Sequence, residues 1–302
     1  MFEVPIGFFV FNRLDTTMEV FSRIKEIQPK KLYLISDGPR ENHHDEENKV
    51  KQVRKYIEDN IDWECSVFKN YSKTNLGCKN RMSSGITWIF DNEEQAIILE
   101  DDVKPTLDFF YFTKELLDKY KNNPNVMMIT GFKKLNSYYT NDSYIFSNHA
   151  MIWGWATWRR AWEQYDVDIV SWEVAKKDGH LKRYYNFFGY IKSKKDFDSV
   201  YYHKKDTWDF QWAYTLLEHG GLCIVPCENM IENIGFGRDD ATHTKMSTSQ
   251  DFSCNKMCFP LQHPKKITVD SKYDKEYMKK GWGLLAVIKI AIKRLFRGKL
   301  ID

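Results

Sequence analysis

The sequence predicts an α/β fold in which helices cover both faces of a mostly parallel central sheet. Through residues 1–135, short apolar runs alternate with segments whose apolar residues recur at helical spacing. This alternation is typical of βαβ units, whose right-handed crossovers set parallel strands side by side. A chain of 302 residues with 42% hydrophobic and 29% charged residues can also bury a large core.

Five strands are expected in this first half, each a short apolar run that ends in polar or turn residues. They span residues 5–11, 32–35, 65–68, 96–99 and 126–130. Helices are expected between them, and Asp15 or Thr16 would cap the first helix. Parallel strands end at a common edge of the sheet, where open α/β folds bind their ligands.

Three adjacent carboxylates, Glu100, Asp101 and Asp102, follow the apolar run 96–99 and precede Pro105. Adjacent anions repel one another, so such a cluster usually needs a cation to relieve it. Hard oxygen ligands favour Mg²⁺ or Mn²⁺, which commonly carry a diphosphate. A solvated acidic turn is the alternative, but the buried strand before the cluster and the proline after it favour a metal site.

The same edge is expected to gather Arg13, after the first strand, and Asp37, after the second. The chain contains no G-x-x-x-x-G-K-[ST] motif, and no G-x-G-x-x-G motif follows its first strand. A P-loop and a dinucleotide-binding fingerprint are therefore both excluded.

Aromatic side chains are dense in residues 144–215. Such rings can form rigid walls for sugars or bases, but most of them are expected in the core. The aromatics in question are Trp153, Trp155, Trp158, Trp162, Trp172, Tyr184, Tyr185, Phe187, Phe188, Trp208 and Trp212.

A strand and a turn-rich loop are expected over residues 222–237. Gly235 and Gly237 would allow a close backbone approach, and Arg238 and His243 beyond them could reach a phosphate. The alternative is an ordinary turn with a surface arginine.

The composition and the N-terminal sequence indicate which binding partners and which cellular compartment to expect. A net charge of +3 does not indicate a nucleic-acid partner. Met1 is followed by an apolar segment without the features of a signal peptide, so the expected location is the cytoplasm, where six cysteines stay reduced. The pairs Cys223/Cys227 and Cys254/Cys258 could suggest zinc, but ordinary thiols are favoured because their spacing alone is weak.

The C-terminal segment 281–302 predicts a basic amphipathic helix. Its apolar part, residues 281–292, is shorter than the ~20 residues that span a bilayer. Lys289, Lys293 and Arg297 recur every four residues, opposite an apolar face. This pattern predicts peripheral attachment to the inner face of the cytoplasmic membrane. A helix docked on the rest of the protein is the alternative.

Several stretches together resemble GT-A fold, nucleotide-sugar-dependent glycosyltransferases. The run 96–103 and the helix-like 107–112 are similar to the metal-site signature of the alpha-mannoside beta-1,2-N-acetylglucosaminyltransferase family. Residues 5–13, 34–38, 208–212 and 226 with 236–238 resemble other family motifs in the same order. The similarity covers residues 4–245. The membrane anchor and luminal stem of the family are not recognised in the sequence, so a bacterial relative that builds lipopolysaccharide, capsule or another surface glycan is expected.

The resemblance implies a role for each candidate residue. Asp102 would bind Mn²⁺ or Mg²⁺, with His243 as a further candidate ligand. Asp209 would be the general base of an inverting transfer from a UDP-sugar, such as UDP-GlcNAc, to a glycan or glycolipid acceptor. The other residues would contact the donor, namely Glu100, Asp101, Arg13, Asp37 and Arg238.

Alternatives remain for the base and for the function. Asp206 is the other candidate base, and Asp209 could instead be a helix N-cap. A sugar-1-phosphate nucleotidyltransferase carries a glycine-rich loop after its first strand, which residues 9–14 lack. A carbohydrate-binding protein would account for the tryptophans without needing the carboxylates.

The expected organisation has three parts. Residues 1–245 would form the catalytic domain, with a nucleotide-sugar-binding half over 1–135 and an acceptor-binding half over 136–245. Residues 246–280 would be an extension that leads into the helix over 281–302.

Overall fold

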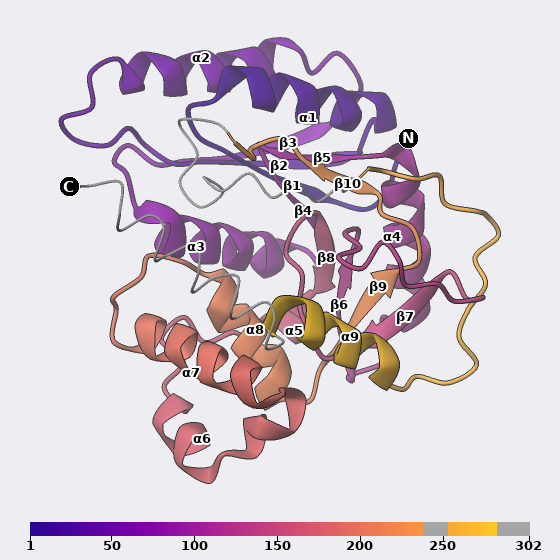
Figure 1. The fold of residues 1–302 in the computed structure, drawn as a ribbon. Coiled ribbons are helices and arrows are strands. Elements are labelled where there is room, and N and C mark those ends of the chain that lie inside the picture. Colours follow the sequence, from indigo (N-terminus) through magenta and orange to yellow (C-terminus); the bar gives the residue numbers. More distant parts are fainter. Residues whose placement is uncertain (238–252, 283–302) are drawn as a thin grey trace, which may run out of the picture.

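The computed structural model describes residues 1–237 and 253–282 and confirms the predicted α/β class (Figure 1). Its centre is an eight-stranded sheet in the order β3-β2-β1-β4-β8-β6-β9-β7. Six of these strands run in one direction, and β8 and β7 run in the other. The strands are β1 (Ile6–Val10), β2 (Lys31–Ser36), β3 (Ser66–Tyr71), β4 (Gln95–Glu100), β6 (Val126–Thr130), β7 (Tyr144–Ser147), β8 (Trp155–Trp158) and β9 (Leu222–Pro226).

The first half of the chain forms the parallel part of the sheet. Strands β1 to β4 lie where the apolar runs predicted them, and β1 pairs in parallel with both β2 and β4. Figure 1 shows α1 and α2 on one face of these strands and α3 on the other. The helices are α1 (Leu14–Ile27), α2 (Glu46–Asp59), α3 (Gly77–Asn92) and α4 (Leu107–Tyr120).

The expected cap of α1 is wrong. The helix begins at Leu14, ahead of both Asp15 and Thr16, and Arg13 occupies the N-cap position without a side-chain cap bond. Only three residues join β1 to α1, so the helix starts before either candidate cap is reached. Thr17 instead donates its hydroxyl to the Arg13 carbonyl at 2.5 Å.

The fifth predicted strand exists as β6, but it does not lie beside β4. Strand β8 is inserted between them and runs antiparallel to both, with Ala156 opposite Ile97 on one side and Ile129 on the other. All four residues of β8 are buried, and Trp155 stacks on Trp208 with ring centroids 5.5 Å apart. The sequence pattern around these tryptophans predicts aromatic core residues but no strand.

A second, smaller core lies outside the sheet. Four helical segments surround it: α6 (Trp172–Asp178), η1 (His180–Tyr184), α7 (Phe187–Tyr201) and α8 (Asp209–Glu218). Its buried residues are Ile169, Trp172, Ala175, Leu181, Phe197, Val200, Tyr214 and Leu217. Most of the tryptophans of residues 144–215 are buried as predicted, whereas Phe187 is 73% exposed.

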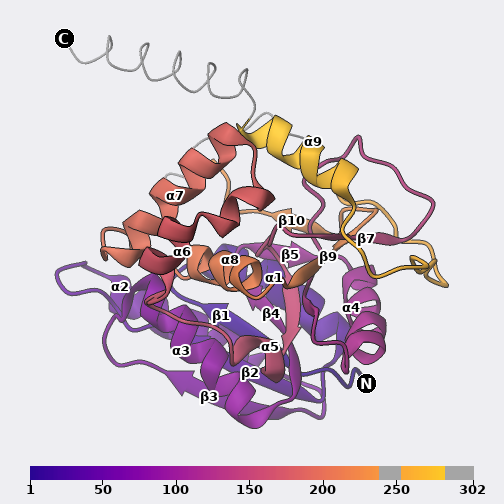
Figure 2. The ribbon, with the colours of Figure 1, turned by 90° about the horizontal axis from the view of Figure 1, so that it is seen from below.

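Strand β10 (Ile231–Asn233) and helix α9 (Ser271–Trp282) pack later parts of the chain against elements of the first half and of the sheet. Strand β10 pairs antiparallel with β5 (Val103–Pro105), directly after the acidic cluster. Helix α9 contacts α7 and β7, and the short helix α5 (Arg159–Trp162) follows β8. Figure 2 shows α9 beside α7 at the periphery. Residues 283–302, most of the predicted basic helix, lie outside the described residues.

Among the described helices, none combines the length and the apolar character that crossing a membrane requires.

Candidate active site

The three carboxylates lie at the carboxyl end of β4, as the sequence predicts. Glu100 is the last residue of β4 and is paired in register with Phe9 of β1. Asp101 accepts a hydrogen bond from the Phe11 backbone N–H at 3.3 Å, just beyond the end of β1. The acidic cluster, Glu100 to Asp102, is therefore held against the neighbouring strand.

Arg13 provides positive charge at this cluster. Its guanidinium donates to Asp102 Oδ2 at 3.0 Å, and the two side chains are only 16% and 19% exposed. The expectation that Arg13 and the carboxylates share one edge of the sheet is confirmed. In this structure Arg13 contacts the candidate metal ligand itself.

The cluster carries more negative charge than Arg13 balances. Burial raises the pKa of Glu100 well above its ordinary value, and the charges of Asp102, Asp101 and Asp209 raise it further. Burial also raises the pKa of Asp101 to about 7, with the Asp102 charge adding to the effect. Bringing a cation to these oxygens would relieve both effects.

The loop after β10 closes onto Asp102. The Ile234 N–H donates to the Asp102 carbonyl at 2.8 Å, and a Cβ at Gly235 would lie 2.3 Å from Asp102 Oδ2. The expected close backbone approach is therefore found at Gly235, because a side chain there would displace the carboxylate. Arg238 and His243, which follow this loop in the sequence, lie outside the described residues.

Asp37 is buried at the end of β2 and is bonded to the backbone. Its Oδ1 accepts N–H groups from Gly38 and Leu76, both at 2.9 Å, and burial raises its pKa. These bonds hold the segment that leads into α3 against β2. The expected contact of Asp37 with a nucleotide stays a prediction.

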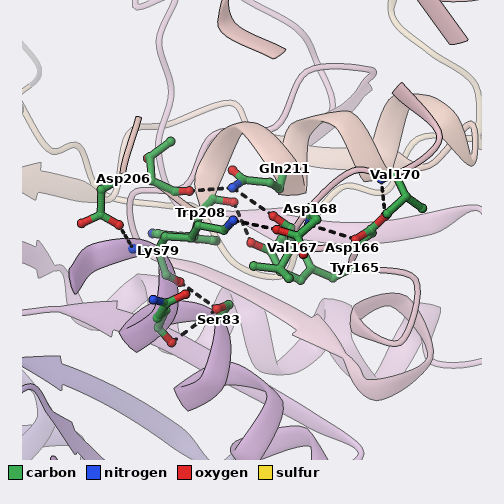
Figure 3. Close-up of polar contacts among 12 residues, drawn as sticks. Lys79, Ser83, Tyr165, Asp166, Val167, Asp168, Val170, Asp206, Trp208 and Gln211 are labelled. Atoms are coloured by element: carbon green, nitrogen blue, oxygen red, sulfur yellow. Dashed lines mark hydrogen bonds and ion pairs between the residues drawn. The ribbon is translucent and has the colours of Figure 1, made fainter. Parts of the chain in front are cut away.

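Asp206 serves as the cap of α3. Its two oxygens accept the backbone N–H groups of Cys78 at 2.9 Å and Lys79 at 2.8 Å. Figure 3 shows this carboxylate turned toward Lys79. The close contact also explains Gly77, where φ is +78° and a Cβ would meet Asp206 Oδ2 at 2.7 Å.

Asp209 is placed differently from Asp206. It is the first residue of α8, where Trp208 occupies the N-cap position without a side-chain cap bond, so the N-cap alternative for Asp209 is wrong. Thr207 donates its hydroxyl to Asp209 Oδ1. Figure 3 shows Trp208 beside Tyr165, whose hydroxyl donates to the Trp208 carbonyl at 3.2 Å.

Cys78 marks the place where the acidic residues converge. Burial raises the pKa of its thiol, and four carboxylates from three segments raise it further: Glu100, Asp206, Asp209 and Asp37. Cys78 is not among the residues predicted from the sequence, because an isolated cysteine at a helix start carries no recognisable signal. The charges of Asp209 and of Glu100 in the acidic cluster therefore both act on this thiol.

Two adjoining hollows run along the outer side of α3, with volumes of about 470 and 380 Å³. They share Thr87, Asp91 and Tyr165. Tyr165 connects them to the first turn of α8 through its bond to Trp208. The hollows therefore lie beside the residues that position Asp209, not over the acidic cluster.

The acidic cluster suits a divalent cation that takes only some of its ligands from the protein. Within residues 1–237 and 253–282, no three His, Cys, Asp or Glu side chains come together so as to hold a metal ion. That finding also leaves the zinc alternative for the cysteines without support there. The cluster does supply carboxylate oxygens and excess negative charge, which fits an ion such as Mg²⁺ that keeps water or phosphate ligands.

Comparisons with known proteins give only distant matches. No family model matches the chain, and no curated protein matches its sequence. One similar structure is the mannosyltransferase PcManGT from Pyrobaculum calidifontis with GDP-Man and Mn²⁺, at 11% identity, a TM-score of 0.40, and coverage of 71% of this chain and 74% of that one.

Two other matches are of the same quality. GalNAc-T7 with UDP, GalNAc and Mn²⁺ has 12% identity, a TM-score of 0.47 and 74% coverage of this chain, which spans 42% of the GalNAc-T7 chain. The 4-diphosphocytidyl-2C-methyl-D-erythritol synthase from Anaerococcus prevotii has 12% identity, a TM-score of 0.31, and coverage of 54% and 75%. Values this low assign neither a family nor an activity.

Proposed function

We propose that the protein is a metal-dependent, inverting glycosyltransferase that uses a UDP-sugar, such as UDP-GlcNAc. The observation that carries this proposal is the acidic cluster held beside Arg13 at the carboxyl edge of the sheet, where the charge of Asp209 also acts on Glu100. The sequence resemblance to GT-A glycosyltransferases supports the same assignment. The acceptor would be a glycan or glycolipid of a bacterial surface polysaccharide.

Asp102 would hold Mn²⁺ or Mg²⁺, with His243 as a further candidate ligand. A divalent cation bound there would neutralise charge on the departing diphosphate. Arg13 already contacts Asp102 and would keep its carboxylate oriented. Contacts to the donor would come from Glu100, Asp101, Arg13, Asp37 and Arg238.

Asp209 would take the proton from the acceptor hydroxyl. Thr207 holds Oδ1, which leaves Oδ2 to face the acceptor. Asp206 is the weaker candidate because both of its oxygens are bonded to the start of α3. Trp208, which precedes Asp209, is 2% exposed, so the core fixes the chain at the start of α8.

Two alternative functions fit less well. A sugar-1-phosphate nucleotidyltransferase would need a glycine-rich loop after β1, but only Phe11, Asn12 and Arg13 join β1 to α1. A carbohydrate-binding protein would need exposed aromatic walls, yet Trp155, Trp208 and most other tryptophans of this region are core residues. Neither alternative requires three carboxylates beside Arg13.

The test is a calorimetric titration of the protein with UDP in the presence and absence of Mn²⁺. We expect binding only with metal, and a loss of about tenfold or more in Asp102→Ala and Asp102→Asn. Asp118→Ala, an exposed carboxylate on α4, is the matched control. Metal-dependent affinity that is unchanged in both Asp102 variants would refute the metal assignment.

A second measurement separates the enzyme classes. Incubation with a panel of nucleotide sugars and Mn²⁺ should release UDP from one UDP-sugar, even with water as the acceptor. A nucleotidyltransferase would instead release pyrophosphate from UTP and a sugar 1-phosphate. A binding protein would do neither.

A further inference from the structure

Helix α7 exposes apolar side chains on its outer side. Phe187 and Ile191 lie one turn apart and are 73% and 52% exposed, and exposed Lys195 continues the same stripe. The opposite side of α7 carries Phe197 and Val200, which are buried in the smaller core. The exposed stripe therefore faces away from the protein interior.

The part of the chain that carries this stripe is rich in basic residues. Residues 172–205 contain nine Lys or Arg and four Asp or Glu, although the whole chain has a net charge of only +3. Three of the four acids are already ion-paired, Glu173 with Lys176 and Asp196 and Asp198 with lysines of α7. The exposed basic residues that remain are Lys177, Lys182, Arg183, Lys195, Lys204 and Lys205.

An apolar stripe within a basic surface matches the chemistry of an anionic bilayer, in which phosphate groups lie above acyl chains. The position of α9 supports this match. Met278 of α9 packs against Gly189 of α7, and Figures 1 and 2 both show the two helices side by side at the periphery. The chain leaves α9 for residues 283–302, whose sequence is itself basic and amphipathic.

We propose that the α7 face, defined as Phe187, Ile191 and Lys195 with Lys182 and Arg183, docks on an anionic lipid surface. In this arrangement Phe187 and Ile191 enter the boundary between headgroups and acyl chains, and the basic residues contact lipid phosphates. The segment 283–302 is not expected to bind to this face, because both are positively charged and would repel each other. The proposal is independent of the catalytic assignment.

The experiment measures binding of the full chain to phosphatidylcholine vesicles with and without phosphatidylglycerol. We expect Phe187→Ser/Ile191→Ser and Lys182→Glu/Arg183→Glu each to weaken binding to the anionic vesicles by about tenfold or more. The matched controls are Tyr111→Ser, an exposed aromatic on α4, and Lys51→Glu/Lys55→Glu on α2. Both controls should bind like the unmodified protein.

A second variant reports whether α7 itself enters the lipid. Subtracting the tryptophan fluorescence of the unmodified protein from that of Phe187→Trp isolates the emission of the new tryptophan. This emission should shift to shorter wavelength when anionic vesicles are added. If Phe187→Ser/Ile191→Ser binds normally and the shift is absent, the α7 face is not the docking surface. Emission at short wavelength before any lipid is added would show that protein covers residue 187, and would also overturn the proposal.

Discussion

The carboxylate of Asp206 accepts the backbone N–H of Cys78, 128 residues earlier in the chain, at 2.9 Å. Its other oxygen accepts the next N–H of α3, that of Lys79. These bonds satisfy two donors that a helix N-terminus would otherwise leave unpaired. Asp206 thus has a structural role, which distinguishes it from Asp209 three residues later.

Asp209→Asn should reduce transfer while leaving donor affinity near that of the unmodified protein. The substitution keeps the shape of the side chain but removes the proton acceptor, and general base catalysis typically contributes ~10²–10⁴-fold. The measurement is the steady-state rate with the donor found in the nucleotide-sugar panel, together with UDP affinity by calorimetry.

Asp206→Asn is the matched control and should keep most of the activity. Asp206→Ala should instead lower the free energy of unfolding by about 1 kcal/mol, the usual cost of losing a helix cap. If Asp206→Asn abolishes transfer and Asp209→Asn does not, the two assignments are reversed.

Gly235→Ala should weaken metal-dependent UDP binding by about tenfold, because crowding of this kind typically costs 1–3 kcal/mol. The added Cβ would lie 2.3 Å from Asp102 Oδ2, so the carboxylate or the loop must move. Calorimetry with UDP and Mn²⁺ gives the affinity. Gly281→Ala is the control, since the nearest atom to its added Cβ is 3.8 Å away. Equal affinities for the two variants would mean that the position of the Asp102 carboxylate does not matter for binding.

His149 should make the protein less stable as the pH falls from 6.5 toward 4. Burial lowers the pKa of this histidine to about 4, the Lys134 charge lowers it too, and Asp274 opposes the shift. Between these pH values His149 is protonated in the unfolded chain but stays neutral in the folded protein. The free energy of unfolding therefore decreases as the pH falls through this window. The largest decrease in the free energy of unfolding that His149 can cause is about 3 kcal/mol.

His149→Phe isolates this contribution. Phenylalanine can keep the stacking on Tyr277, where the ring centroids are 4.7 Å apart. Denaturant unfolding of both proteins at several pH values gives the difference in free energy, in which shared contributions such as that of Asp101 cancel. A difference that does not change between pH 7 and pH 4 would show that His149 titrates normally in the folded protein.

Removal of residues 283–302 should leave a folded protein that binds anionic vesicles more weakly. The lost segment contains Lys289, Lys293, Arg294, Arg297 and Lys299, each contributing about 1 kcal/mol near an anionic surface. Thermal unfolding and vesicle co-sedimentation provide the two readouts. Residual binding that disappears at high salt is expected from the α7 face. Unfolding of the truncated chain would favour the alternative of a docked core helix.

Local patterns in the sequence determined the first half of the fold and the location of the acidic cluster. An apolar run that ends in carboxylates specifies both a buried strand and the place where its polar end must emerge. For this reason β4 and the position of Glu100–Asp102 follow from residues 96–105 alone. The same holds for β1 and β2, whose ends bring Arg13 and Asp37 to the same edge of the sheet.

Only the tertiary structure decided which distant residues meet there. The insertion of β8 beside β4, the bond from Asp206 to α3 and the approach of Gly235 to Asp102 all join residues far apart in the chain. Such contacts depend on strand register and loop paths, which no short window of sequence contains. The same limit explains why Trp208 is buried while Phe187 is exposed: aromatic character is a property of the residue, whereas burial depends on what the rest of the chain places against it.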